Sequence, residues 1–349
     1  MKNNIFAIAL TALALSIATG CSSAEGQADA PDAVIFETDL GNDVDDALAL
    51  AMLHNYVDQG KIRLAAVMLN KKGVEPMMLA DIINTYYGHP DIEIGTVSEG
   101  VTCGNEDSNY AKSVAEMTDQ NGDALFPRSH ESYDSIPEAT KLYRKILASE
   151  PDSSVTIISV GFSTNLARLL DSKADEISPL GGRELVAKKV KLLSAMAGSG
   201  TDPNTPEYNV YMDAAAAKKV FSSWPGEVVM SPFEVGMAIN YPATVIENDS
   251  LWPSMPNPVV EAYKCYQPMP YDRPTWDLTS VLYAIEGAES FELSQPSVVS
   301  VGENGTTAFT PDSTATRRYL KVDSIGAANI LERLIHLTTF TPRAVLVNK

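Results

Sequence analysis

The stretch over residues 34–53 constrains the fold of this chain most, because it joins an apolar run to a helical run through an acidic loop. Residues 34–36 (V-I-F) are β-branched and aromatic, as in a strand that is buried on both faces. Residues 45–53 are strong helix formers, and the two aspartates that open them lie where the helix dipole stabilises negative charge. The stretch therefore predicts a buried parallel strand that leads directly into a helix.

Five carboxylates crowd the end of this predicted strand and the loop after it: Glu37, Asp39, Asp43, Asp45 and Asp46. Like charges this close repel one another strongly in a partly dry cleft unless a cation lies among them. The oxygens suit Ca²⁺, whereas Zn²⁺ would require His or Cys, which the loop lacks. The carboxyl end of a strand in an open α/β sheet is also where ligands bind. We therefore expect a metal site here; a solvated helix start would explain only Asp45 and Asp46.

Further apolar runs predict more strands of the same sheet. They cover residues 62–69, 92–97, 155–160, 190–196 and 227–230. Later, an Asn304-Gly305 pair between two short apolar runs predicts a hairpin. We expect an α/β fold with a mostly parallel central sheet flanked by helices, formed as one domain by residues 32–349.

The chain is strongly acidic, with 45 Asp and Glu against 26 Lys and Arg and a formal net charge of −19. This balance argues against a nucleic acid or an anionic membrane surface as a partner. Composition leaves the kind of small-molecule partner open, and both a monomer and a homo-oligomer stay open.

Residues 1–20 have the pattern of a secretory leader: a lysine, an apolar run over residues 5–17 and small residues before Cys21. The cysteine after this site resembles the lipobox of bacterial lipoproteins, which implies cleavage before Cys21 and lipid on that residue. The apolar run is too short for a transmembrane helix. Residues 21–31 are small, polar and acidic and predict a flexible tether. We expect a lipid-anchored protein of the bacterial cell envelope that contacts the membrane through its lipid only.

Three segments resemble signatures of the inosine-uridine-preferring nucleoside hydrolases. Residues 37–47 (E-T-D-L-G-N-D-V-D-D-A) are similar to D-x-D-P-G-x-D-D-A, with Glu for the first Asp, Leu for Pro and two extra residues. Residues 161–167 (G-F-S-T-N-L-A) are similar to G-P-L-T-N-L-A, and residues 204–209 (N-T-P-E-Y-N) to a shortened N-x-T-P-x-x-E-F-N. The resemblance implies a nucleoside-hydrolase-like fold and Ca²⁺-dependent hydrolysis of the N-glycosidic bond of ribonucleosides, which releases ribose and free base.

The resemblance also implies roles for individual residues. Carried over, the Ca²⁺ ligands are the carboxylates of Asp39, Asp46 and Asp277 and the backbone carbonyl of Thr164. The implied substrate-binding residues are Asn70, Asn204, Glu207 and Asn209. On the residues alone, Thr164 is equally an N-cap and Asn70 equally a turn former.

The general base depends on how the acidic loop is aligned. It is Asp45 if the helix start sets the alignment and Asp43 if the loop does. We prefer Asp45, because the helix start matches more residues of the signature.

Trp276 is the most informative departure, because many members of the family have a histidine directly before the last metal-binding aspartate. None of the four histidines of this chain is at that position. We expect Trp276 to stack on the leaving base; the alternative is core packing. Base preference therefore stays open.

Two other functions compete with hydrolysis of nucleosides. Phosphatases with a D-x-D nucleophile are disfavoured, since Glu37 stands where their aspartate would be. A metal-dependent riboside- or carbohydrate-binding lipoprotein without hydrolytic activity needs the same metal ligands but no base. A third possibility, intermediate between nucleoside hydrolysis and binding alone, is hydrolysis of a riboside other than a common nucleoside.

Overall fold

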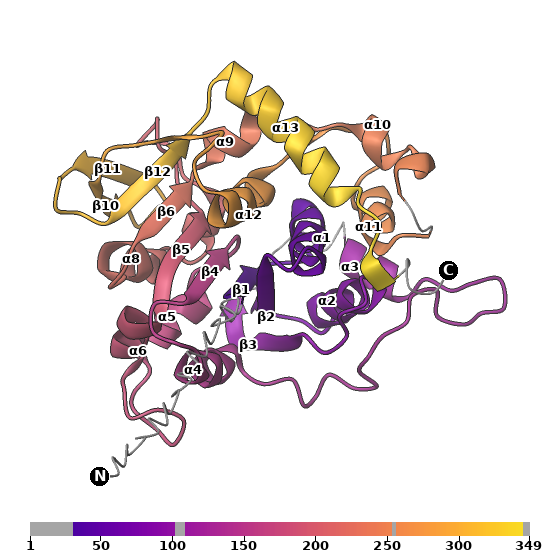
Figure 1. Cartoon of the computed structure of the whole chain (residues 1–349), viewed down its shortest axis with the longest axis horizontal. Coiled ribbons are helices and arrows are strands. Elements are labelled where there is room, and N and C mark those ends of the chain that lie inside the picture. The colour runs from indigo at the N-terminus through magenta and orange to yellow at the C-terminus, as the bar shows by residue number, and fades with distance from the viewer. Residues whose placement is uncertain (1–30, 102–108, 253–255, 345–349) are drawn as a thin grey trace, which may run out of the picture. The chain divides into compact units, whose positions relative to one another are not determined.

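Strand β1 (Asp32–Thr38) is an interior strand of a ten-stranded sheet, between β4 and β2, as the buried character of residues 34–36 predicts (Figure 1). The computed structural model describes residues 31–101, 109–252 and 256–344. The predicted signal peptide, Cys21 and nearly all of the predicted tether lie outside these residues, so the lipid anchor and the envelope location stay predictions. Among the described helices, none combines the length and the apolar character that a membrane span requires.

The strands follow the order β11-β10-β12-β6-β5-β4-β1-β2-β3, and β9 pairs with β12. All pairs from β12 to β3 along this order are parallel. The antiparallel pairs of this sheet are β10 with β11, β10 with β12 and β9 with β12. The remaining strands of the sheet are β2 (Ile62–Lys71), β3 (Glu93–Val101), β4 (Val155–Ser159), β5 (Val190–Met196), β6 (Val228–Ser231), β9 (Glu292–Leu293), β10 (Ser297–Val301), β11 (Thr307–Pro311) and β12 (Arg317–Lys321). The predicted α/β fold with a mostly parallel sheet is confirmed, and so is the hairpin, which β10 and β11 form.

The order of the strands reverses between β1 and β4, since the chain runs outward from β1 to β2 and β3 and then returns to β4 on the other side. In open parallel sheets such a switch point leaves a crevice at the carboxyl ends of the two strands, where ligands bind. The acidic loop follows β1 directly, so the topology places it at this crevice.

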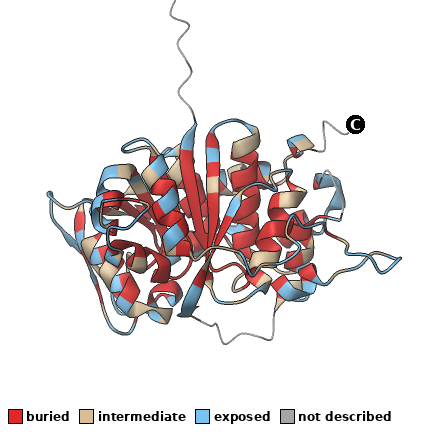
Figure 2. Ribbon diagram, turned by 90° about the horizontal axis from the view of Figure 1, so that it is seen from below, coloured by how far each residue is buried: buried red, intermediate tan, exposed pale blue. Residues whose placement is uncertain are grey.

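Helices cover both faces of the sheet, and the strands between them are buried along most of their length (Figure 2). One core includes residues of the helices α1 (Asp45–Asp58), α2 (Glu75–Tyr86), α3 (Tyr110–Ala115), α11 (Pro258–Tyr266), α12 (Trp276–Glu286) and α13 (Ser324–Thr338). The other includes residues of α4 (Ala139–Ser149), α5 (Thr164–Asp171), α6 (Gly182–Lys189) and α8 (Ala214–Ser223). The shorter elements are α7 (Tyr208–Met212), α9 (Phe233–Met237), α10 (Ala243–Ile246), a 3₁₀ helix (Asp249–Leu251) and the strand pair β7 (Asn240–Tyr241) and β8 (Arg273–Pro274).

Helix α1 is buried over its first twelve residues, from Asp45 to Tyr56. Its sequence is apolar on all sides, which is typical of a helix enclosed by other elements rather than one lying on the surface. It packs against α12 and α13 as well as β2. The burial of Asp45 and Asp46 therefore follows from the position of the whole helix.

Candidate active site

The carboxyl ends of β1 and β4 approach closely at Gly161. A Cβ atom at this position would lie 2.6 Å from the backbone nitrogen of Asp39 and 2.6 Å from the side-chain oxygen of Asn70, so only glycine fits. Tyr110 of α3 holds the loop after β1: its hydroxyl accepts the N–H of Gly41 at 2.8 Å and donates to the carbonyl of Asp43 at 2.5 Å. The acidic loop is thus fixed against the strand ends.

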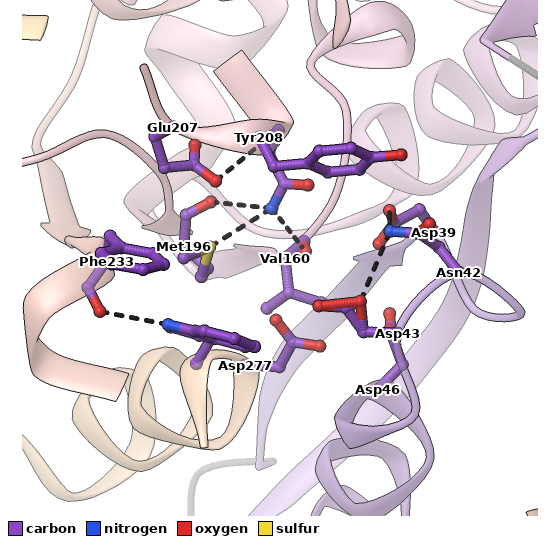
Figure 3. Close-up of a pocket in the computed structure, with 12 residues that line it drawn as sticks. Asp39, Asn42, Asp43, Asp46, Val160, Met196, Glu207, Tyr208, Phe233 and Asp277 are labelled. Carbon is purple, nitrogen blue, oxygen red and sulfur yellow. Dashed lines mark hydrogen bonds between the residues drawn. The ribbon is translucent and has the colours of Figure 1, made fainter. Parts of the chain in front are cut away.

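A cavity of about 380 Å³ opens beside this loop (Figure 3). Carboxylates from the β1–α1 segment lie on one side of it and Phe233 of α9 on the other. The lining residues are Asp39, Asn42, Asp43, Asp46, Val160, Met196, Glu207, Tyr208, Asn209, Phe233, Trp276 and Asp277. Segments far apart in the sequence therefore form one acidic pocket with aromatic residues in its wall.

Three of the lining aspartates are almost completely buried: Asp39, Asp46 and Asp277. Burial raises the pKa of each well above that of an ordinary aspartate, and repulsion from neighbouring aspartates raises it further. Hydrogen bonds from Asn42 to Asp39, at 2.9 Å, and from Thr38 to Asp46 offset only part of this cost. Negative charge on these three carboxylates therefore destabilises the folded protein unless a cation is bound beside them.

The donor chemistry of the pocket fits a hard divalent cation. One oxygen of Asp46, Oδ2, is buried and has no hydrogen-bond partner among the described residues. A buried carboxylate oxygen without a partner costs free energy that a cation would recover. In the described part of the chain no three Asp, Glu, His or Cys side chains already form a complete metal site, so the fit rests on the type and burial of the donors.

The two candidate bases occupy different environments. Asp43 lines the pocket and forms an ion pair with Arg273, at 2.9 Å between Oδ2 and Nη2. Asp45 is buried and does not line the pocket; its Oδ2 accepts the backbone N–H of Asp277 at 3.1 Å. Arg273 also lies 3.9 Å from Asp45, and burial raises the pKa of Asp45 to about 7 despite this. Of the two candidate bases, Asp43 lines the pocket and Asp45 does not.

Of the four residues predicted to bind the sugar, the structure brings Glu207 and Asn209 to the pocket. Both oxygens of Glu207 accept backbone N–H groups, and the amide of Asn209 donates to the carbonyl of Val160 at 3.1 Å. Their side chains are therefore oriented before a ligand binds.

Asn70 and Asn204 do not line the pocket. Asn70 is fully buried, and its amide is engaged at both ends: it donates to Glu37 at 3.2 Å and accepts the N–H of Phe162 at 3.1 Å. Asn204 is exposed. Asn70 thus ties the ends of β1, β2 and β4 together instead of facing a ligand, because Glu37 occupies its donor group.

Thr164 is the first residue of α5, and its hydroxyl donates to Asp213 at 2.5 Å. It does not line the pocket, whereas Val160, the residue that follows β4, does. The carbonyl of Val160 accepts one hydrogen bond, from Asn209, and has a second lone pair, so Val160 rather than Thr164 could hold a cation through its backbone. The position before Gly161 is the signal that could have indicated it.

Trp276 lines the pocket but is held by its neighbours. Its indole N–H donates to the carbonyl of Phe233 at 3.1 Å, its ring stacks on that of Phe233, and the guanidinium of Arg273 lies 4.9 Å from its centroid. Trp276 therefore both lines the pocket and packs against neighbouring side chains, so it has features of both predicted roles. Sequence reasoning missed Phe233, Tyr208, Met196 and Arg273, since their positions along the chain carry no chemical signal.

The calcium-free protein is expected to lose stability as the pH rises from about 5 to about 7.5. Burial raises the pKa of Asp45 from 3.8 and that of Glu207 from 4.5, both to about 7. The folded state then binds more protons than the unfolded chain between these values, so the free energy of unfolding falls as pH rises. Thermal melts in EGTA across this range test this, with Glu207→Gln as the variant that should flatten the slope. A melting temperature that rises with pH in EGTA would contradict it.

The fold and the pocket define an α/β protein with an acidic site for a small polar ligand at the switch point of a parallel sheet. Residues 34–327 match the family described as inosine-uridine preferring nucleoside hydrolase. The chain belongs to this family and is a nucleoside N-glycosidase, which confirms the resemblance seen in the sequence.

Solved nucleoside hydrolases share the fold at low identity. The plant nucleoside hydrolase PpNRh1 is similar with a TM-score of 0.65 at 17% identity, covering 87% of this chain and 99% of that one. The inosine-uridine preferring nucleoside hydrolase of Bacillus anthracis is similar with a TM-score of 0.64 at 17% identity, and the match covers 88% of this chain and 99% of that one. The purine-preferring ribonucleoside hydrolase of Gardnerella vaginalis is similar with a TM-score of 0.64 at 17% identity, and the match covers 88% of this chain and 100% of that one. No curated protein sequence matches this chain.

Proposed function

We propose that this protein hydrolyses ribonucleosides to ribose and free base and that it depends on Ca²⁺. The observation that carries this proposal is the group of buried carboxylates that line one pocket with Glu207 and Asn209. Carboxylates suit Ca²⁺, and an amide beside a carboxylate suits the vicinal hydroxyls of a sugar.

The ion would be held by the carboxylates of Asp39, Asp46 and Asp277 and by the carbonyl of Val160. When bound, such a cation holds sugar hydroxyls and lowers the pKa of a nearby water molecule. The carbonyl of Val160 already accepts one hydrogen bond from Asn209, and a carbonyl oxygen has a second lone pair available. The chain thus offers three carboxylates and one backbone carbonyl on the lining of the same pocket.

The side chains of the pocket divide the remaining tasks. Asp43 accepts the proton of the attacking water, Asn209 orients the sugar, and Glu207 stabilises the positive charge that develops on the ribosyl ring. Arg273 holds Asp43 in place through its ion pair. Water attack at C1′ then breaks the bond between the sugar and the base.

The assignment of the base predicts different behaviour for two matched variants. Asp43→Asn is expected to lower kcat for nucleoside hydrolysis by about 10²–10⁴-fold, because a general base contributes about that much. Asp45→Asn is expected to lower kcat less, since Asp45 does not line the pocket. Ribose release from a panel of purine and pyrimidine nucleosides with Ca²⁺ measures both.

Two results would count against these roles. A larger loss in Asp45→Asn than in Asp43→Asn would return the base to Asp45. If the wild-type protein binds nucleosides but releases no ribose from them, the binding lipoprotein is favoured instead of the hydrolase.

A further inference from the structure

The pocket contains many acidic groups and lacks the usual side-chain proton donors. Among its lining residues in the described part of the chain there is no His, Lys, Arg or Cys. All four histidines of the sequence are described, and each lies elsewhere. His54 and His89 contact each other at 2.9 Å, His130 lies 3.4 Å from Asp81, and His336 is exposed on α13.

The other polar groups of the pocket are poor acids or are already engaged. The N–H of Trp276 donates to the carbonyl of Phe233. Burial raises the pKa of Glu207 to about 7, but both of its oxygens already accept backbone N–H groups, from Asn209, Gly198 and Val210, so contacts within the chain hold this carboxyl group in place. Carboxylates that bind a cation carry no proton. The hydroxyl of Tyr208 is the remaining acidic group on the lining, on a side chain that is 42% exposed.

The charged residues that line the pocket are also all negative. Five carboxylates line it, and the two nearby cations are not lining residues. Arg273 is paired with Asp43, and the ammonium group of Lys71 donates to the carbonyl of Gly41. Even with a divalent cation bound, the lining keeps a surplus of carboxylates. Beside them lie aromatic rings, whose faces attract positive charge.

We propose that the preferred substrates are N-ribosides whose leaving group carries a fixed positive charge, such as pyridinium ribosides; this inference rests on the proposed hydrolase function. When the C1′–N bond breaks, its electron pair goes to the ring nitrogen. A neutral base would leave as an anion and need a proton, whereas a pyridinium leaves as a neutral pyridine. Water supplies the oxygen on C1′, and its proton passes through the base carboxylate to solvent.

The test compares ribose release from nicotinamide riboside, a pyridinium probe, with release from inosine and uridine by the Ca²⁺-loaded protein. Each kcat/KM is divided by the uncatalysed rate constant of that substrate, so that the intrinsic lability of the pyridinium bond cancels. We expect the corrected value for nicotinamide riboside to equal or exceed both others, because a general acid would raise only the values for inosine and uridine, by at least about 100-fold.

Three outcomes overturn the inference in different ways. A corrected value for nicotinamide riboside below that for inosine or uridine removes the inference and leaves the hydrolase intact. Tyr208→Phe that lowers inosine hydrolysis at least about 100-fold, with nicotinamide riboside hydrolysis retained, identifies Tyr208 as the acid; Tyr211→Phe, an exposed tyrosine outside the lining, is the matched control. No ribose release from any of the three substrates rejects the proposed function itself.

Discussion

Removal of Ca²⁺ with EGTA is expected to lower kcat/KM for nucleoside hydrolysis by at least about 10³-fold, and added Ca²⁺ is expected to restore it. A metal ion contributes several kcal/mol to such a reaction, and about 4 kcal/mol corresponds to that factor. The buried carboxylates of Asp39, Asp46 and Asp277 also repel one another, so EGTA should lower the melting temperature as well. Ribose release and thermal melts on the same samples measure both effects.

Two variants connect this result to the pocket. Asp46→Asn and Asp277→Asn each remove one proposed ligand and reduce the repulsion, so both should weaken Ca²⁺ binding while making the calcium-free protein more stable. A protein that metal analysis shows to be free of Ca²⁺ and that retains full activity would contradict the metal requirement.

Arg273→Met is expected to destabilise the calcium-free protein by about 3 kcal/mol. The guanidinium is largely buried, pairs with Asp43 at 2.9 Å, lies 3.9 Å from Asp45, and stacks 4.9 Å from the rings of Tyr266 and Trp276. Removing one partner of a buried ion pair costs about 3–5 kcal/mol, and the partial exposure of Asp43 places this case at the lower end. The melting temperature should fall by about 6–12 °C.

Arg333→Met is the matched control, because Arg333 forms an ion pair with Glu286 alone and is more exposed. A surface pair contributes about 0–1 kcal/mol, so this variant should change the melting temperature little. Added Ca²⁺ should recover part of the loss in Arg273→Met, since it offsets the same carboxylates. Equal destabilisation by both variants would show that Arg273 has no special role in the acidic loop.

The acidic wall of the pocket could be predicted because its parts are close in sequence. Asp39, Asp43 and Asp46 directly follow a buried strand, and a strand end in a parallel sheet is a ligand site wherever the rest of the chain lies. The place of Asp277 in the site could be predicted only from the family resemblance, because nothing in a helix start by itself indicates a metal ligand. The structure confirms that it joins the other three in one pocket.

Asn70, Asn204 and Thr164 were assigned by alignment to motifs, and the structure brings none of them to the pocket. For Asn70 the physical reason is clear, because a polar side chain faces a ligand only if its neighbours do not already satisfy it. Glu37 and Phe162 engage the two ends of its amide. These partners lie 33 and 92 residues away in the sequence, so spacing alone does not reveal them.

The sequence by itself determined the α/β class, the parallel sheet and the acidic loop at a strand end, because apolar periodicity and local charge act over a few residues. Only the tertiary structure decided that Asp43 rather than Asp45 lines the pocket, that Val160 lies in the wall of the pocket, and that Arg273 pairs with Asp43. These outcomes depend on which way a side chain points once α1 is enclosed and on contacts between distant segments. Packing around the switch point sets them, and no local pattern encodes that packing.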